Sequence, residues 1–232
     1  MEISKRQRDF IFAALDIVNN HGFYALTIRS LAERVGVSEP AVYRHFKSKS
    51  DFFYIFLEYV KNEWETLLKK SAKDSIDGFD ELTAKLHVIV EYFADNPGYS
   101  ELLFSLDKIN TNSKIQKLIS GVANMAESLI SEAVERAQKE GSIRADITKG
   151  TLTEQILGMV IFRIMMWKDS GRKYPLKKDW KRFWDSSKRL YKSIPTAQQF
   201  LGRMFIRSEN RQRSREDEGN FSSALKEEGS RQ

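Results

Sequence analysis

The sequence predicts an all-α protein with a small N-terminal head of three helices and a larger C-terminal helical domain. Apolar residues recur at intervals of three and four along nearly the whole chain, and the alternating pattern typical of strands is nearly absent. Only four prolines interrupt the 232 residues. With 41% hydrophobic residues, the chain is long enough to bury one small and one larger core.

The first helix is predicted over residues 5–21, because its apolar side chains share one face and Gly22 follows its last turn. That face consists of Phe10, Ala14, Ile17 and Val18. Phe23 and Leu26, in the connection that follows, are expected to cover the core of the head.

A second helix is predicted to begin after Thr27, whose hydroxyl can accept an N–H of the first turn. Its apolar face consists of Ile28, Leu31, Ala32 and Val35. Gly36 ends this helix, because glycine readily takes the left-handed conformation found at helix C-termini. Ser38 is then expected to cap a third helix, with Pro40 in its first turn, where a missing N–H costs little.

The third helix combines an apolar and a polar face. Val42 and Phe46, four residues apart, are expected to pack inward. The side chains expected to face outward are Glu39, Ala41, Tyr43, Arg44 and His45. A helix, a tight glycine turn and a second helix with an exposed polar face make up the helix-turn-helix motif, whose second helix enters the major groove of DNA. The sequence therefore predicts a head that binds double-stranded DNA.

Residues 27–51 resemble the DNA-binding domain of the TetR family of bacterial transcriptional regulators. Members of that family carry a threonine at the start of the second helix, a Gly-Val-Ser turn and the sequence Tyr-x-His-Phe-x-x-Lys. Here these stand as Thr27, Gly36-Val37-Ser38, Tyr43-Arg44-His45-Phe46 and Lys49. The specific resemblance covers residues 6–55, and the rest of the chain agrees in helical layout. Pro40 stands where many members have glycine, and Val35 where alanine is commoner.

Ten residues are expected to form the DNA interface. They are Thr27, Arg29, Ser38, Glu39, Pro40, Ala41, Tyr43, Arg44, His45 and Lys49. We assign Thr27, Tyr43 and Lys49 to phosphates, because a helix N-terminus and a cationic side chain both favour anions. Arg29 is expected at a phosphate or at the edge of the groove.

We assign Glu39, Ala41 and Arg44 to contacts with base edges. An arginine can donate two hydrogen bonds to guanine, and the methyl group of an alanine can touch that of thymine. His45 is expected nearer the DNA backbone. The alternatives are structural: Tyr43 could pack its ring at the edge of the core, and His45 could be an ordinary surface histidine.

The C-terminal domain is predicted to be helical as well, with stops at Asn96-Pro97-Gly98 and Lys139-Glu140-Gly141. The expected ranges are 49–70, 78–96, 100–107, 113–140, 148–169 and 176–193. The apolar residues Phe200, Leu201, Met204 and Phe205 permit a further amphipathic turn. The charged sequence beyond Ser208 predicts a disordered tail. The expected domains are residues 1–48 for DNA binding, 49–207 for effector binding and dimerisation, and 208–232 as the tail.

An effector pocket is expected among the large, soft side chains of the C-terminal domain, where members of the family bind small molecules. The candidates are Phe79, His87, Phe93, Phe104, Met125, Met159, Phe162 and Met166. An apolar lining would suit a lipophilic or aromatic effector. The alternative is that these residues simply form the core, as aromatic and methionine side chains at helical spacing often do.

A homodimer is expected, because one recognition helix covers too few base pairs for specificity and paired helices read a palindromic operator. The last two long helices offer two apolar faces. One consists of Leu152, Ile156, Met159 and Val160. The other consists of Trp180, Phe183, Trp184, Leu190 and Tyr191. The alternative is that both faces pack within the subunit.

Composition excludes several other classes of protein. The chain contains no cysteine, which removes disulfides, cysteine-based metal sites and thiol catalysis. Its three histidines are scattered, and no glycine-rich phosphate loop or H-x-x-x-H sequence is present, so we expect neither an enzyme nor a metal or cofactor site. The absence of a long apolar run and of a signal peptide predicts a cytoplasmic, nucleoid-associated protein without membrane contact.

The net charge of +6 is distributed unevenly. Residues 1–50 carry eight Lys and Arg against five Asp and Glu, whereas residues 51–164 carry 13 against 18. A basic head on an acidic body suits a DNA-binding protein. Residues 165–202 carry 10 Lys and Arg against three Asp and Glu, which is either a solvated surface or a second anionic contact. The overall prediction is a homodimeric transcriptional repressor released by a small effector. The alternative is a DNA-binding protein that a protein partner controls.

Overall fold

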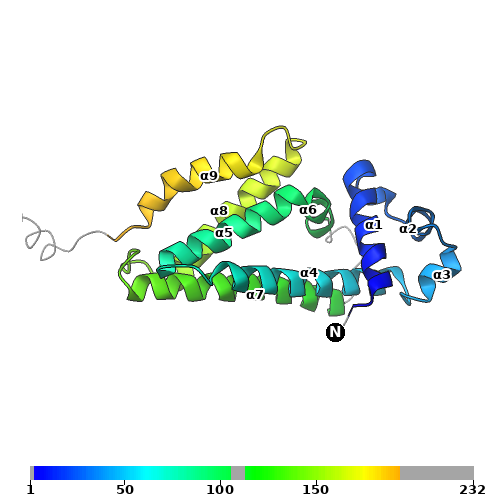
Figure 1. Ribbon diagram of the computed structural model, residues 1–232, viewed down its shortest axis with the longest axis horizontal. Coiled ribbons are helices and arrows are strands. Elements are labelled where there is room, and N and C mark those ends of the chain that lie inside the picture. Colours follow the sequence, from blue (N-terminus) through cyan, green and yellow to red (C-terminus); the bar gives the residue numbers. More distant parts are fainter. Residues whose placement is uncertain (1–2, 106–112, 194–232) are drawn as a thin grey trace, which may run out of the picture. The chain divides into compact units, whose positions relative to one another are not determined.

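The structure, a computed structural model, describes residues 3–105 and 113–193, and throughout these residues the fold is helical (Figure 1). The helices are α1 (Lys5–His21), η1 (Phe23–Ala25), α2 (Ile28–Val35), α3 (Glu39–Tyr43), α4 (Lys49–Ser71), α5 (Gly78–Asp95), α6 (Pro97–Leu103), α7 (Ser113–Lys139), α8 (Lys149–Asp169), α9 (Leu176–Ser187) and η3 (Lys188–Leu190). Within the described ranges the β-structure consists of one isolated bridge, between Ile143 and Lys192. The predicted amphipathic turn near Phe200 and the predicted tail lie outside the described residues.

The head is built from α1, α2 and α3 around one aromatic and aliphatic core. Ser4 caps α1 by accepting the Gln7 N–H, and Thr27 caps α2 as predicted by accepting the Ser30 N–H. Phe10 of α1 is fully buried and lies edge-on to Phe46, at 5.4 Å between ring centroids. The prediction of a three-helix head with its apolar faces turned inward is confirmed.

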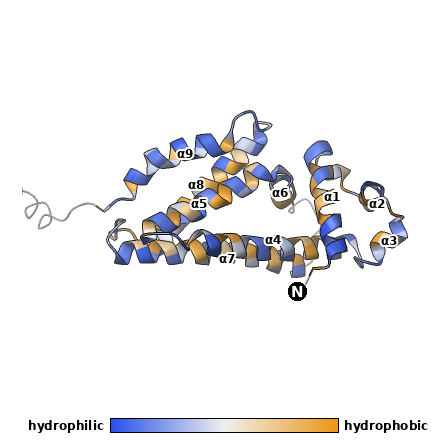
Figure 2. Ribbon diagram, viewed as in Figure 1, coloured by the Kyte–Doolittle hydropathy of each residue, from blue (hydrophilic) through white to orange (hydrophobic). Residues whose placement is uncertain are grey.

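The body is a bundle in which α7 packs against α4, α5 and α8, and α9 covers α5 and α8 (Figure 1). Hydrophobic residues lie on the facing sides of these helices and hydrophilic residues on their outer sides (Figure 2). Burial of these apolar faces holds the helices together. The observed helices match the predicted ranges closely, with two exceptions.

The first exception is α6, which begins at Pro97 and not at residue 100 as predicted. Asn96 ends α5 and also precedes α6, and Pro97 stands at the first position of α6, where its missing N–H is not needed. The Asn-Pro-Gly sequence therefore redirects the chain from one helix into the next. The second exception is the last helix, where α9 ends at Ser187 and continues as the short 3-10 helix η3.

Two buried glycines allow helices to approach closely. A Cβ on Gly98 of α6 would lie 2.5 Å from the carbonyl oxygen of Leu15 in α1. A Cβ on Gly78 of α5 would lie 2.3 Å from the backbone nitrogen of Ala137 in α7. Any other residue would push these helices apart. The contact at Gly98 sets the distance between the head and the body.

The loop between α8 and α9 makes a second link from the body to the head. Arg172 in this loop has a positive φ of 62°, which is unusual for a residue with a Cβ. Its guanidinium donates to the side-chain oxygen of Asn19 in α1 at 2.5 Å and lies 3.5 Å from the carboxylate of Glu101 in α6. A residue of the last third of the chain thereby contacts the first helix.

Candidate nucleic-acid interface

The third helix of the head is attached by its apolar side and exposed on the other. Val42 is completely buried and Phe46 is 1% exposed, so both pack inward as predicted. The helix itself is shorter than predicted, because α3 ends at Tyr43 and Phe46 lies beyond it. Glu39 and Arg44 are exposed, and half of the surface of Tyr43 is accessible. Such a helix presents polar and cationic groups on a rigid support, as insertion into a groove requires.

The turn before α3 places this helix against α2. Gly36 adopts the left-handed conformation at φ 73° and ψ 40°, as predicted for a residue that ends a helix. Ser38 has the extended backbone of a cap, and its carbonyl accepts the Ala41 and Val42 N–H groups. Ser38 thus occupies the N-cap position of α3 as predicted, although its side chain makes no capping hydrogen bond. The exposed Ser38 side chain is therefore not used to hold the helix start.

Thr27 and Lys49 lie at one corner of the head. The Thr27 hydroxyl accepts the Ser30 N–H at 3.0 Å, and the Ser30 hydroxyl oxygen accepts the Thr27 N–H at 2.9 Å. The Lys49 ammonium donates to the carbonyl of Leu26, the residue before Thr27, at 2.9 Å. The start of α2 and the start of α4 thus meet, and a cation stands beside a helix N-terminus. This arrangement suits an anion.

Two of the predicted interface residues are held by other side chains. Arg29 donates to Glu33 at 3.0 Å, and this hydrogen bond together with the charge of Glu33 raises the pKa of Arg29. His45 is only partly exposed, because its ring lies 5.4 Å from that of Phe10 and its carbonyl accepts a hydrogen bond from Gln7. The expectation that His45 faces outward is therefore only partly met, since α1 covers one side of the ring.

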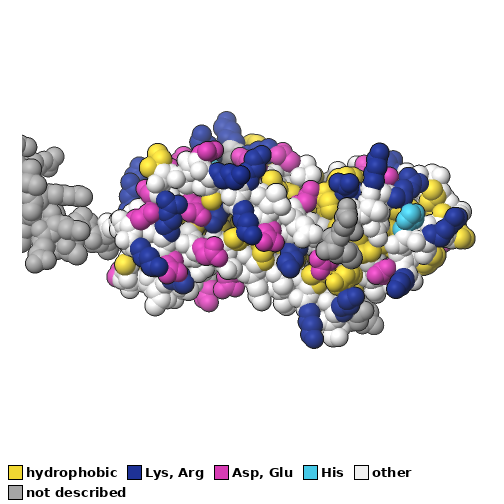
Figure 3. Space-filling model, turned by 60° about the horizontal axis from the view of Figure 1, so that its bottom comes forward, with side chains coloured by type: hydrophobic (Ala, Val, Ile, Leu, Met, Phe, Trp, Pro, Cys, Tyr) yellow, Lys and Arg dark blue, Asp and Glu magenta, His cyan; other side chains and the backbone are white. Residues whose placement is uncertain are grey.

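The distribution of charge differs between the head and the body. On the face drawn in Figure 3, Lys and Arg side chains gather around the head, whereas Asp and Glu side chains are mixed with them over the body. The exposed cations of the head include Arg44, Lys47 and Lys49, at the end that carries α3. A basic surface around an exposed helix attracts polyanions such as DNA.

A family model described as "Bacterial regulatory proteins, tetR family" matches residues 10–54. The match covers most of α1, all of α2 and α3, and the turn between them. Residues 10–54 therefore match the N-terminal domain of the TetR family. The chain is a DNA-binding transcriptional regulator of the helix-turn-helix type.

Similar proteins cover the head and most of the body. The chain is 26% identical over 181 residues to the nucleoid occlusion factor SlmA of Vibrio campbellii, covering 77% of this chain and 92% of that protein. The fatty acid degradation regulator FadR from Bacillus halodurans has a similar fold, with a TM-score of 0.68 at 16% identity over 77% of this chain and 92% of that one. The transcriptional regulator FadR from Bacillus subtilis, in complex with stearoyl-CoA, has a TM-score of 0.65 at 15% identity, covering 75% and 92%.

The structure does not bring together in one place the eight residues proposed for the effector pocket. Phe79 packs against Trp184 beside α9, whereas Phe93 packs against Trp64 and Phe104 beside α4. The outward-facing members are Phe162, which is 62% exposed, and Met166, which is 49% exposed. His87, Met125 and Met159 are half-buried. Helical periodicity identified apolar positions, but it does not indicate which of them face the same space.

His87 is the polar member of that group. Its ring lies edge-on to Trp180 at 6.4 Å, and its Nε2 atom is buried and makes no hydrogen bond to the described residues. Burial lowers the pKa of His87, while the nearby charge of Glu91 opposes the shift. Glu91, one helical turn further along α5, therefore acts on His87 through its charge.

The proposed dimer faces must be corrected. Leu152, Ile156 and Val160 are completely buried inside the subunit, where they face the bundle core. Trp180, Trp184 and Tyr191 are buried within the subunit as well. The apolar residues that α8 leaves accessible are on its opposite side: Phe162, Met165 and Met166. Because α8 is apolar on both sides, the sequence pattern did not distinguish the core face from the outer face.

Other kinds of site find little support in the described residues. Across residues 3–105 and 113–193, no three carboxylate, histidine or cysteine side chains lie close enough together to hold a metal ion. None of the helices in the same ranges combines the length and the hydropathy that a membrane span requires.

Proposed function

We propose that this TetR-family regulator reads DNA with the exposed side of α3 and works as a homodimer. The proposal assigns residues 1–48 to DNA binding and residues 49–207 to dimerisation and effector binding. It rests on one observation: Val42 and Phe46 fix α3 to the core while Glu39, Tyr43 and Arg44 remain exposed. In this arrangement, Arg44, Ala41 and Glu39 contact base edges, and Ser38, Pro40 and Tyr43 lie at the groove edge and its phosphates.

Thr27 and Lys49 are proposed to bind one phosphate. An ammonium group has three N–H donors, and in the free protein Lys49 uses one of them on the Leu26 carbonyl. The other two N–H groups of the ammonium remain available for a phosphate at the start of α2, where the helix dipole also favours an anion. Arg29 can bind a neighbouring phosphate if it gives up its hydrogen bond to Glu33. His45 supports the helix beside the DNA backbone.

For dimerisation we propose the outer side of α8. Phe162 is 62% exposed, Met166 is 49% exposed and Met165 is 40% exposed, and all three follow one side of the helix. Large apolar side chains grouped in this way favour a contact with another protein surface. In a dimer with its two-fold axis through this surface, each of the two α3 helices would read one half of a palindromic operator.

The control of DNA binding has two candidate explanations. A lipophilic effector is favoured by the similar fold of the Bacillus subtilis FadR, which was solved with stearoyl-CoA. Control by a protein partner without an effector is favoured by the 26% identity to a nucleoid occlusion factor. A thermal-shift series with acyl-CoA esters of increasing chain length separates them, because a ligand of the folded state raises the melting temperature. A rise accompanied by release of DNA supports the effector, and an unchanged melting temperature for every ester supports the partner.

The DNA-reading proposal is tested with two variants on duplexes selected from a random pool. Arg44→Ala should lose about 1–3 kcal/mol at one base position and leave other positions unchanged. Lys49→Ala should weaken all duplexes alike and flatten the dependence of affinity on salt concentration. Titrations at several salt concentrations measure both effects. An equal loss on every sequence for Arg44→Ala would remove this residue from base recognition.

A further inference from the structure

A groove runs between the first helix of the head and the long helix α4. Its volume is about 430 Å³, which is in the range that accommodates a small organic molecule. The N-terminal side contributes Ile3 and Arg8. The α4 side contributes Tyr59, Asn62, Glu63, Thr66 and Leu67. The groove is separate from the residues that were expected to bind an effector, and a molecule bound in it would contact the head and the body at once.

Glu63 carries a fixed negative charge on the α4 side of this groove. One carboxylate oxygen accepts the Tyr59 hydroxyl at 2.5 Å, and the other accepts the Tyr92 hydroxyl at 3.1 Å. Burial, together with the carboxylate of Glu63, raises the pKa of Tyr59, so that this hydroxyl remains a donor. Among the described residues no Lys, Arg or His forms an ion pair with Glu63. The half-buried carboxylate is therefore held in place but not neutralised.

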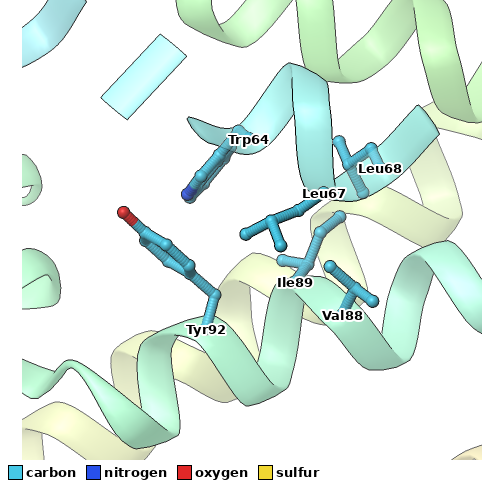
Figure 4. Close-up of a pocket in the computed structure, with 6 residues that line it drawn as sticks. All are labelled: Trp64, Leu67, Leu68, Val88, Ile89 and Tyr92. Atoms are coloured by element: carbon cyan, nitrogen blue, oxygen red, sulfur yellow. The ribbon is translucent and has the colours of Figure 1, made fainter. Parts of the chain in front are cut away.

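Tyr92 links the groove to the interior between α4 and α5. Its ring lies edge-on to Trp64 at 5.7 Å, and in Figure 4 the two rings stand on opposite helices above a small apolar gap closed by Leu67, Leu68 and Ile89. Trp64 and Tyr92 are each 8% exposed. The support behind Glu63 is thus rigid and largely dry, which strengthens electrostatic interactions with its carboxylate.

The ring of Tyr59 adjoins this carboxylate, because its hydroxyl donates to Glu63. Phe12 of α1, which is 53% exposed, lies edge-on to Tyr59 in turn, with 6.1 Å between the ring centroids. An aromatic ring beside a carboxylate is a favourable environment for an ammonium group, which is attracted by the face of the ring and by the negative charge. The α4 side of the groove therefore suits a cation.

The opposite side of the groove carries an unpaired positive charge. Arg8 is exposed, and its guanidinium makes no hydrogen bond or ion pair with the described residues. Arg8 and Glu63 line the same groove, but they are not within ion-pair distance of each other. Two opposite charges that face one groove without pairing would be satisfied together by a ligand that carries both charges.

We propose that the groove between α1 and α4 binds a small zwitterion, with its ammonium group at Glu63 and its carboxylate at Arg8. Asn62 and Thr66 offer hydrogen bonds along the groove, and Ile3 and Leu67 offer contacts to an apolar substituent. The chemical class that fits is an α-amino acid, or a close derivative, with an apolar side chain. Because the site joins α1 to α4, its occupant stabilises one orientation of the head, and its effect on DNA affinity depends on whether that orientation is the DNA-bound one.

The test uses the full chain and calorimetric titration with L-phenylalanine, L-leucine and L-tryptophan. Two analogues of the amino acid that binds remove one charge each: its amide lacks the carboxylate, and its N-acetyl derivative lacks the ammonium group. The zwitterion should bind about tenfold or more tightly than either analogue. This comparison requires no variant and no DNA, so its result is independent of how the head reads DNA.

The variants assign each charge to its residue. Glu63→Gln should remove the preference for the free amine, and Arg8→Gln should remove the preference for the free carboxylate. Glu65→Gln on α4 and Lys5→Gln on α1 are matched controls outside the groove and should bind like the wild type. Absence of binding by all three amino acids at millimolar concentration would overturn the proposal, as would binding that neither Glu63→Gln nor Arg8→Gln alters. Equal affinity for the zwitterion and its amide would overturn it too.

Discussion

Replacing Gly98 with alanine should weaken the contact between α6 and α1 that joins the body to the head. The added Cβ would lie 2.5 Å from the Leu15 carbonyl oxygen, and 3.1 and 3.2 Å from the carbonyl carbon and Cα of the same residue. Ordinary contact begins at 3.4 Å, so the two helices must separate by about 0.9 Å. The opposing atoms belong to backbone, which cannot move aside as a flexible side chain does.

Overpacking of this kind costs about 1–3 kcal/mol, and the better helix propensity of alanine returns at most about 1 kcal/mol. For a chain of this size we therefore expect the melting temperature to fall by about 2–6 °C. Because α1 supports α3 through Phe10 and Phe46, a displaced α1 should also weaken DNA binding.

Denaturation at a fixed protein concentration measures the loss of stability, and a DNA titration measures the second effect. The matched control is Gly121→Ala in α7, where an added Cβ meets no atom within 4 Å. This variant should be more stable than the wild type by about 0.5–1 kcal/mol, since alanine is the better helix former. If Gly98→Ala proved as stable as the wild type, the close approach of α6 to Leu15 would not exist.

Three further predictions concern the body. Phe162→Asp should shift the protein from dimer to monomer in sedimentation, because it places a charge on the apolar outer side of α8; an intact dimer would locate the interface elsewhere. Arg172→Ala should be less stable in urea than Arg172→Gly by about 1 kcal/mol, since both lose the contact with Asn19 but only alanine retains the strain of a positive φ; equal stability would show that the strain is absent. Hydrogen bonds from two lysines lower the pKa of Glu135 to about 2, so its stabilising effect is present above the unfolded-state pKa of about 4.5 and is lost as the pH falls towards 2. The stability difference between the wild type and Glu135→Gln should close over that range, and a difference that persists at pH 2 would contradict the assignment.

The head could be predicted in detail because its signals are local. Thr27 caps the helix that begins one residue later, and Gly36 ends it. Val42 and Phe46, four residues apart, both pack inward, although α3 ends at Tyr43. Each of these properties depends on neighbours within about four residues. Ser38 takes the predicted N-cap position, but the sequence does not indicate that its hydroxyl makes no capping hydrogen bond there.

The body could be predicted in its helices but not in its surfaces. Ile156 and Phe162 are both apolar residues of α8, yet the first is completely buried and the second is 62% exposed. A helix that is apolar on both sides has no pattern that distinguishes the core from an outer face. The eight pocket candidates were chosen by residue type. Residue type does not indicate which helices face each other, so it could not predict which of these side chains would meet.

Taken alone, the order of residues determined that this chain is helical, where most of its helices begin and end to within a residue or two, and that its N-terminus carries a helix-turn-helix. Tertiary packing decided the rest. It brought Arg172 to Asn19, placed the Lys49 ammonium on the Leu26 carbonyl, and left Glu63 and Arg8 in one groove without an ion pair to any described residue. The physical reason is that helix formation and capping are short-range interactions, whereas the meeting of distant side chains depends on how the apolar faces of several helices are buried together.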